Sequence, residues 1–288
     1  MVRALVVSGL LGAACSRFDP SAPHLELVYR PINASPTEIE ATVQMMRGRL
    51  ENLGARGQVG RQGDLIVVKL DPRSDVARVK RVIGKRAKLE FALVDDSAEA
   101  NAAAAEIAMP PAVTSERTSW SERDRNVEHQ QVYFKAASRA PLDVLAARVP
   151  SRWRLGIERI PAAEGAEEWH GMLLAKTSPL GGDDLTDAEV SWDKQTNRPE
   201  VNVEFSHDAA RVLEKFSADN IGRKLAIVFD GEVQSAPIIE SKLGARIRIT
   251  LGSFGDPMQL QVEAKDMVAV LRSATLPVPV ELIRMENK

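Results

Sequence analysis

Segments with the period of a β-strand alternate with segments of helical period in both halves of this 288-residue chain. The stretch Val201–Phe205 alternates apolar and polar residues strictly, as a half-buried strand does. A helical stripe recurs at 4-3-4-3 spacing through Ile39, Val43, Met46, Leu50 and Leu53. Because each such segment buries one face, the pattern predicts an α+β fold of sheets covered by helices on one side.

The first predicted unit spans residues 25–95 and reads strand, helix, strand, helix, strand. Its first helix begins at a capping box, with Ser35 at the N-cap and Glu38 three positions later, and ends at Gly54. Ser74 is the predicted cap of the second helix. The glycines at 57 and 60 are interpreted as loop residues.

Residues 96–150 differ in character from the rest of the chain, with a short alanine run, a Pro-Pro pair and a polar stretch. They are predicted to be an irregular insertion or linker, with a partial helix as the alternative. Residues 151–288 form the second predicted α+β unit. In it, Thr186–Glu189 fits a capping box, and Asp230-Gly231 predicts a tight hairpin turn.

The N-terminus predicts a signal peptide with a lipid-attachment site over residues 1–15, followed by a polar tether over 16–24. Ala4–Ala14 is apolar or small throughout, but eleven residues at about 1.5 Å each fall far short of a hydrocarbon core of about 30 Å. The stretch ends at Cys15 in a pattern similar to the bacterial lipobox, from which Gly12 departs. A fragment of a true transmembrane helix is the alternative interpretation.

Composition and spacing argue against catalysis and nucleic-acid binding. The net charge is −2 and aromatic residues make up 5% of the chain, so neither a basic surface nor an aromatic stacking platform is expected. The four histidines are isolated in the sequence, and neither HExxH nor CxxC spacing occurs. We therefore predict no enzyme, no metal site and no cofactor.

Several long stretches closely resemble the SecD family of the bacterial protein-export machinery. They are Asp183–Ala188, Arg198–Phe205, Asp219–Ile239 and Val270–Val280 in the second half, and Met46–Ala55 and Lys88–Phe91 in the first. The family usually has glycine where this chain has Ala274 or Thr275. The resemblance implies the first periplasmic domain of SecD, with a base and a head built on ferredoxin-like α+β subdomains.

The resemblance implies a lipid-anchored protein on the periplasmic side of the cell envelope. It would bind exported, unfolded polypeptides or dock on Sec translocase subunits, without nucleic acid or a small-molecule cofactor. The family's membrane-embedded helical bundle has no counterpart, so proton-driven pulling by this chain alone is not expected. A structural or regulatory envelope lipoprotein without an export role is the alternative.

Two predicted contact surfaces follow, because an unpaired sheet edge can add a strand from an extended peptide. One is the hairpin after Asp230 and the other is the last strand, near Val278. The candidate partner-binding residues are Asp230, Gly231, Val233, Gln234, Ser235, Pro237, Val278 and Val280, and Cys15 is the candidate lipidation site.

Overall fold

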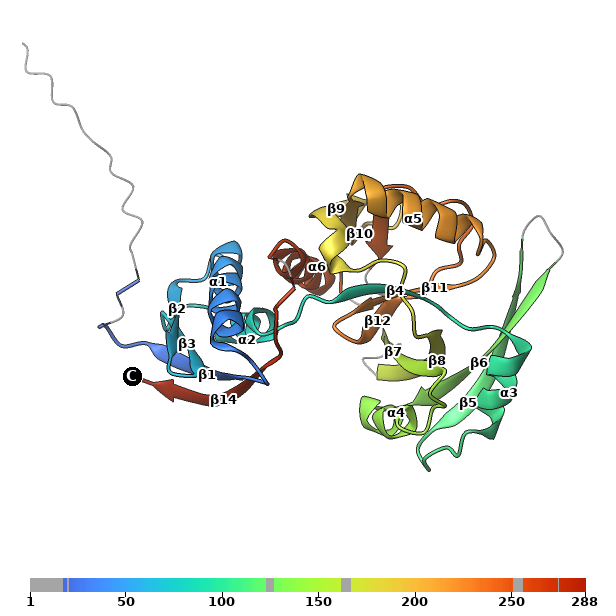
Figure 1. The fold of residues 1–288 in the computed structure, drawn as a ribbon, viewed down its shortest axis with the longest axis horizontal. Coiled ribbons are helices and arrows are strands. Elements are labelled where there is room, and N and C mark those ends of the chain that lie inside the picture. Colours follow the sequence, from blue (N-terminus) through green and yellow to red (C-terminus); the bar gives the residue numbers. More distant parts are fainter. Residues whose placement is uncertain (1–17, 20, 123–126, 162–166, 251–255, 274) are drawn as a thin grey trace, which may run out of the picture.

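The computed structural model describes residues 18–19, 21–122, 127–161, 167–250, 256–273 and 275–288. The predicted signal segment and its lipidation site, Cys15, lie outside the described residues. Within these ranges, every helix is too short or too polar to cross a bilayer. The mixed α+β fold expected from the sequence is confirmed (Figure 1).

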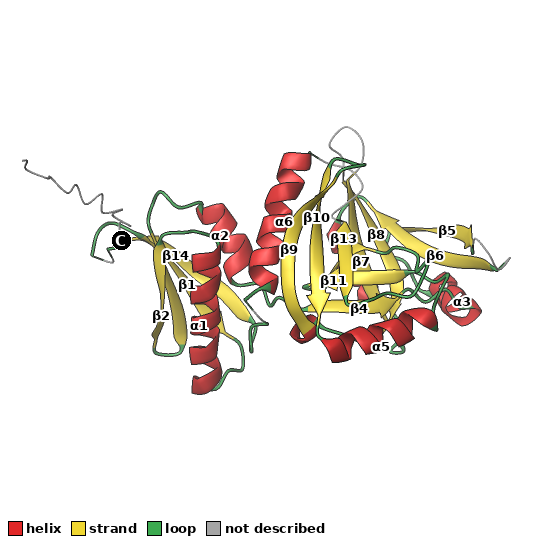
Figure 2. Cartoon of the chain, turned by 90° about the horizontal axis from the view of Figure 1, so that it is seen from above, coloured by secondary structure: helices red, strands yellow, loops and turns green. Residues whose placement is uncertain are grey.

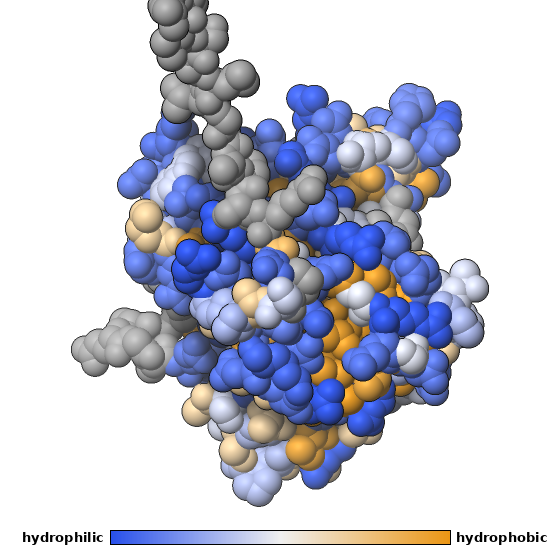
Figure 3. Space-filling view, turned by 90° about the vertical axis from the view of Figure 1, so that its left-hand side faces the viewer, coloured by the Kyte–Doolittle hydropathy of each residue, from blue (hydrophilic) through white to orange (hydrophobic). Residues whose placement is uncertain are grey.

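A four-stranded antiparallel sheet lies at one end of the molecule and is covered by two helices (Figures 1 and 2). Its strand order is β14-β1-β3-β2, and the chain runs β1-α1-β2-β3-α2 before it leaves for the other body. Figure 3 faces this end and shows a largely hydrophilic surface with apolar residues gathered in a recess. The elements are β1 (Leu25–Pro31), α1 (Pro36–Asn52), β2 (Gly57–Gln62), β3 (Leu65–Leu70), α2 (Val76–Ile83) and β14 (Val280–Asn287).

Local sequence signals explain why α1 forms where it does. The Ser35 hydroxyl accepts a hydrogen bond from the backbone N–H of Glu38, and the Glu38 carboxylate accepts one from the N–H of Ser35. This capping box satisfies donors that the helix itself cannot pair. The apolar stripe is buried against the sheet, and Gly54 follows the helix with a φ of 64° that glycine adopts without strain.

The second body combines a seven-stranded sheet, in the order β4-β11-β12-β7-β8-β6-β5, with a three-stranded sheet, in the order β13-β10-β9. Helices α3 and α4 pack on one face of the large sheet, whereas α5 and α6 share a core with the small sheet and with strands β4 and β11. The elements are β4 (Leu89–Leu93), α3 (Ala98–Glu106), β5 (Thr114–Ser121), β6 (Glu128–Ala136), α4 (Arg139–Ala146), β7 (Trp153–Pro161), β8 (Glu167–Ala175), η2 (Gly182–Asp184), β9 (Leu185–Asp193), β10 (Arg198–Phe205), α5 (His207–Ala218), β11 (Leu225–Phe229), β12 (Glu232–Ser235), β13 (Arg246–Thr250) and α6 (Pro257–Leu271).

The two bodies meet through α6, which lies beside α1 and α2 in both views (Figures 1 and 2). Arg78 and Arg81 of α2 hold the Asp266 carboxylate of α6 at 2.5 and 3.1 Å. Arg49 of α1 is fully buried and donates hydrogen bonds to Ser273 Oγ at 2.7 Å and to the carbonyl oxygens of Ile83 and Lys85. These three acceptors lie on the two chain segments that connect the bodies, α2 to β4 and α6 to β14. We call Arg49, Ile83, Lys85 and Ser273 the Arg49 cluster.

Strand pairing departs from the predicted division of the chain. β4 does not join the first sheet. It pairs with β11 at the edge of the seven-stranded sheet. The place beside β1 is taken by β14, from the other end of the chain. The predicted units at 25–95 and 151–288 thus exchange one strand, β4 for β14. Strand pairing depends on which segments pack into the same hydrophobic core, and not on their order in the sequence.

The segment 96–150 is not irregular, since it contains α3, β5, β6 and α4. Helix α3 is short and rich in alanine, and Ala100 and Ala104 are buried against the sheet. Strand β5 is almost entirely polar because it lies at the sheet edge, where neither face is covered. Both elements therefore lack the periodic apolar pattern on which the prediction relied.

Three smaller predictions are also wrong. Thr186–Glu189 lies within strand β9, where pairing with β10 outweighs the local capping pattern. Gly57 and Gly60 lie in β2, and a Cβ at Gly57 would come within 2.3 Å of the Lys69 carbonyl oxygen of the neighbouring strand. The cap of α2 is Asp75, whose carboxylate accepts a hydrogen bond from the N–H of Arg78.

Candidate functional site

The hairpin after Asp230 forms as predicted but is not a sheet edge. Asp230 and Gly231 have φ values of 50° and 82°, which build the tight turn. Strand β12 then lies inside the large sheet, antiparallel to β11 on one side and parallel to β7 on the other. An extended peptide therefore cannot pair with β12, and the predicted strand addition there is wrong.

Asp230 itself has a structural role. One carboxylate oxygen accepts a hydrogen bond from the N–H of Lys88 at 2.9 Å, and the N–H of Asp230 donates to the Lys88 carbonyl at 2.9 Å. This pair fixes the turn to the start of β4.

The last strand, β14, is an edge strand among the described residues, since it pairs only with β1. The side chain of Val278, just before it, is buried, and that of Val280 packs against the core of the four-stranded sheet. A partner strand could therefore pair with the backbone along the outer edge of β14, whereas the side chains of Val278 and Val280 face the core. The two predicted surfaces thus belong to different sheets, and the structure does not bring them together.

Two cavities border β12. The first, which we call the α6 cavity, measures about 590 Å³ and lies between α2, α6 and the turn of the hairpin. Val233 and Gln234 line it together with apolar side chains of α6, including Leu260 and Met267. Its rim is charged and largely paired: Arg159 lies 3.6 Å from Glu263, for example. The α6 cavity therefore combines an apolar floor with a balanced charged rim.

The second cavity measures about 530 Å³ and lies between the large sheet and strand β13. We call it the Lys224 cavity. Ser235 and Pro237, both candidate residues, line it with Glu158 and Lys224. Burial raises the pKa of Glu158 to about 7, and the positive charge of Lys224 opposes that rise. Burial likewise lowers the pKa of Lys224.

The side chain of Lys224 is held from two sides. Its ammonium donates a hydrogen bond to Gln131 Oε1 at 3.0 Å and lies 4.3 Å from the ring centre of Trp120. Gln131 is itself only 3% exposed, so its pairing with Lys224 removes the cost of an unpaired buried amide. The hairpin formed by β5 and β6 therefore supplies one wall of the Lys224 cavity.

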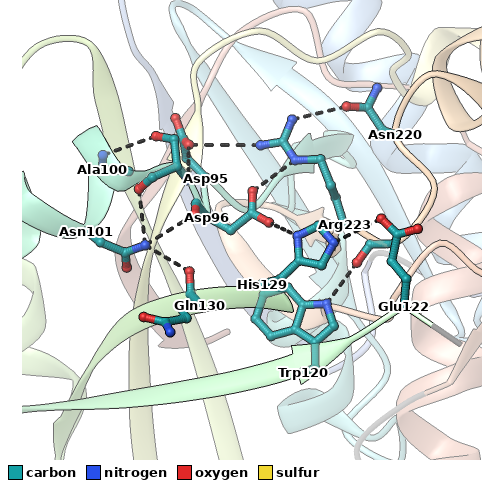
Figure 4. Close-up of polar contacts among 12 residues, drawn as sticks. Asp95, Asp96, Ala100, Asn101, Trp120, Glu122, His129, Gln130, Asn220 and Arg223 are labelled. Atoms are coloured by element: carbon teal, nitrogen blue, oxygen red, sulfur yellow. Dashed lines mark hydrogen bonds and ion pairs between the residues drawn. The ribbon is translucent and has the colours of Figure 1, made fainter. Parts of the chain in front are cut away.

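A buried polar network fastens the turn end of that hairpin (Figure 4). The His129 ring lies between two carboxylates, with Nδ1 2.5 Å from Asp96 Oδ2 and Nε2 3.2 Å from Glu122 Oε1. Arg223 donates from Nε to the other oxygen of Asp96 at 2.9 Å. We call Asp96, Trp120, Glu122, His129, Gly222 and Arg223 the His129 cluster.

The neighbouring Asp95 helps to position this loop. Burial tends to raise its pKa, but hydrogen bonds from Trp153 and Ser97 and the charge of Arg223 outweigh burial and lower it. The Trp153 indole donates to Asp95 at 2.7 Å. The Asp95 carboxylate is thus kept ionised, and its contacts with Trp153, Ser97 and Arg223 hold the loop between β4 and α3 in place.

The His129 cluster resembles a catalytic dyad in its Asp-His contact but differs in one respect. In serine hydrolases the second ring nitrogen faces a nucleophile. Here it faces Glu122, which leaves neither nitrogen free to take a proton from a substrate. In the described ranges, histidine, cysteine and carboxylate side chains do not gather into a group of three able to hold a metal ion.

Sequence reasoning missed this cluster because its members are far apart along the chain. Asp96 and Arg223 are separated by 127 positions, and the cluster draws on three different loops or strand ends. His129 has no histidine or cysteine close to it in sequence. The one local signal was Trp120 within an otherwise polar stretch.

Comparison with known proteins identifies the family. The model for the SecDF P1 head subdomain matches residues 158–278, and the model for the N-terminal part of the SecDF P1 domain matches residues 39–96. Protein translocase subunit SecD of Calditerrivibrio nitroreducens is 29% identical over 252 residues, which cover 87% of this chain and 40% of the relative. SecD of Aquifex aeolicus is 30% identical over 248 residues, which cover 85% of this chain and 38% of the relative. The chain thus spans less than half the length of these curated relatives.

Solved structures agree with this assignment. A crystal structure of SecDF in a super-membrane-facing form has a TM-score of 0.58 and 25% identity, and the match covers 92% of this chain and 30% of that one. A second structure, of SecDF as a membrane component that enhances protein export, has a TM-score of 0.54 and 24% identity over 90% of this chain and 98% of that one, and supports the fold alone. The two family models together cover more than half of the chain, in the order that the family has them. The chain therefore belongs to the SecD family and carries the P1 region, the first periplasmic domain, of its members.

Proposed function

We propose that this protein serves protein export without catalysing a reaction, as a binding module on the periplasmic side of the cell envelope. Its partners are exported polypeptides in an unfolded state or subunits of the Sec translocase. The observation that carries this proposal is the pair of cavities on the two sides of β12, in a chain of the SecD family.

The α6 cavity suits an extended polypeptide because its floor is apolar and its rim offers both signs of charge. An unfolded segment presents apolar side chains beside polar backbone, and both kinds of group find a counterpart there. Since β12 is paired on both sides, contact is made by side chains such as Gln234 and Pro237, and strand addition is left to the outer edge of β14.

Site-specific photocrosslinking in intact cells tests this proposal. A photoreactive residue at Gln234 samples the α6 cavity, and one at Pro237 samples the Lys224 cavity. Val144 on α4 is 51% exposed, borders neither cavity and serves as the control position. We expect adducts with exported polypeptides or Sec subunits at 234 and 237 and few at 144. Equal adducts at all three positions, or none, would favour an envelope protein that kept the fold without an export role.

We also propose that Cys15 carries a lipid that anchors the chain to the membrane. The proposal rests on the short apolar stretch and the lipobox-like residues before Cys15. Mass spectrometry of the mature N-terminus is the direct test. A diacylglyceryl-modified Cys15 supports the anchor, and an intact Met1 refutes it. Replacement Cys15→Ser should release the protein from the membrane fraction.

A further inference from the structure

The His129 ring is placed where only one of its protonation states suits both neighbours. Asp96 Oδ2 faces Nδ1 and Glu122 Oε1 faces Nε2 (Figure 4). An ionised carboxylate accepts hydrogen bonds and donates none, so each ring nitrogen must carry a hydrogen to satisfy its partner. A histidine carries both hydrogens only as the imidazolium cation. In the neutral ring, one lone pair would point at a carboxylate oxygen.

The ring lies among charged groups from three segments of the chain. Asp96 faces it from the β4–α3 loop and Glu122 from the residue after β5, while Arg223 and Lys224, just before β11, reach the cluster through Asp96 and Trp120. Arg223 engages the aspartates, at 2.9 Å from Asp96 and 3.9 Å from Asp95. Lys224 lies over Trp120, on the hairpin side.

Solvent does little to screen these contacts. The side chains of His129, Asp96 and Glu122 are 12%, 8% and 8% exposed. Buried charge pairs are screened much less than surface pairs, so loss of the His129 charge leaves a strong repulsion within the cluster.

The cluster joins the β5–β6 hairpin to the rest of the large sheet. Trp120 stacks on the His129 ring, with ring centres 5.3 Å apart and planes 8° from parallel, and its indole donates to the Gly222 carbonyl at 2.8 Å. Asp96 and Gly222 belong to loops outside the hairpin. Two positions further along β6, Gln131 lines the Lys224 cavity and holds Lys224.

We propose that His129 is a pH-dependent clamp, whose protonated ring holds the β5–β6 hairpin against the β4–α3 and α5–β11 loops and whose deprotonation releases the hairpin and opens the Lys224 cavity. Histidine side chains change charge between about pH 5 and 8. The clamp is therefore closed at the acidic end of this range and loosens as pH rises. Entry of a polypeptide into the opened Lys224 cavity rests on the proposed function, whereas the pH dependence of the clamp does not.

The first test uses the unaltered chain and observes the ring directly. Nitrogen-15 NMR distinguishes an imidazolium, with both nitrogens protonated, from either neutral tautomer. We expect His129 to be doubly protonated at pH 5 and to lose one proton by pH 8. A ring that is neutral at pH 5, or one still doubly protonated at pH 8, overturns the clamp.

Hydrogen exchange of the hairpin amides gives the mechanical readout, after correction for the intrinsic pH dependence of exchange. Protection of residues 117–119 and 131–133 should fall as pH rises, by at most about tenfold per pH unit, over the range in which the closed hairpin keeps the His129 proton and the released hairpin has lost it, because opening there is coupled to loss of one proton. His129→Gln should remove this pH dependence, and His207→Gln, at an exposed position on α5, should retain it. Protection that is constant with pH in the unaltered chain, or a pH dependence that survives in His129→Gln, contradicts the proposal.

These measurements need no polypeptide. Absence of crosslinks at Gln234 and Pro237 would thus refute the binding function and leave the clamp intact. A pH-independent hairpin would refute the clamp and leave binding intact. If His129→Gln does not fold, the nitrogen-15 titration of the unaltered chain still decides.

Discussion

The Arg49 cluster and the His129 cluster are both buried polar joints, but they are built from groups of different chemistry. Arg49 donates to neutral acceptors, two backbone carbonyls and a serine hydroxyl. Burial lowers the pKa of Arg49 only to about 10, so it stays charged throughout the neutral range. His129 lies between two carboxylates, and its hydrogen bonds with them depend on the hydrogens that the ring carries. The comparison teaches that one joint is held by a group that stays charged, whereas the other is held by an imidazole ring, for which we propose a pH-dependent clamp.

The largest expected effect is the loss of stability when Arg49 is removed from the Arg49 cluster, and it should be the same at different pH values. Arg49→Met keeps the apolar stem but leaves the Ile83 and Lys85 carbonyls without their donor. We expect the free energy of unfolding, measured by urea denaturation, to fall by about 3 kcal/mol at both pH 5 and pH 8. Arg47→Met, at an exposed position of the same helix, should cost less than about 1 kcal/mol. Equal losses in the two variants would show that burial of Arg49 matters little.

The next effect concerns Glu158, which lines the Lys224 cavity. Its pKa rises from 4.5 to about 7 on folding, so the native state holds this proton more tightly than the unfolded chain does. Stability from this group is therefore present at low pH and is lost as pH rises through 7. Glu158→Gln should be more stable than the parent by about 2 kcal/mol at pH 8, after allowance for partial solvent screening, and by much less at pH 5. Glu128→Gln, at an exposed site, should show no such pH-dependent gain.

Gly222 offers a way to disturb the His129 cluster by shape instead of charge. Its φ is +88°, and a Cβ there would lie 2.4 Å from the Glu122 side chain. Gly222→Ala should cost about 2 kcal/mol by thermal or urea unfolding, through backbone strain and displacement of Glu122 from His129. Gly231→Ala, with φ of +82° and open space around it, carries the strain alone and should cost about 1 kcal/mol. If the two costs are equal, the Glu122 contact contributes nothing.

The smallest effect probes helix α2, whose C-terminal carbonyl at Ile83 belongs to the Arg49 cluster. Asp75→Ala removes the observed cap and should lower the free energy of unfolding by about 1 kcal/mol. Ser74→Ala removes the cap predicted from the sequence and should change stability by less than about 0.5 kcal/mol. The opposite order would favour the sequence interpretation over the observed hydrogen bond.

The sequence anticipated the features that depend on a few neighbouring residues. The capping box at Ser35, the glycine after α1 and the Asp230-Gly231 turn all form as predicted. Each arises from backbone preferences and hydrogen bonds within about four positions, so the signal is complete in the local sequence. The long motifs shared with the SecD family also lie within continuous stretches of sequence, and the family that they indicate is confirmed.

The sites were predicted less well, and the reason lies in contacts across long separations. The sequence predicts a free sheet edge at the residues of β12, yet the pairing of β12 with β7 closes that edge. The sequence does not predict strand β5 and allows helix α3 only as an alternative, because an edge strand and an alanine-rich helix carry little apolar periodicity. The residues of each segment alone therefore do not predict how that segment is placed in the fold.

The chain's own residues determined its α+β class, its turns and caps, and its kinship with SecD. The tertiary structure alone decided that β14 replaces β4 beside β1, that β12 lies inside a sheet, and that His129 meets Asp96 and Glu122. The physical reason is the range of the forces involved. Capping and periodicity act within one or two turns, whereas strand exchange and buried charge clusters depend on which distant segments the hydrophobic cores bring together.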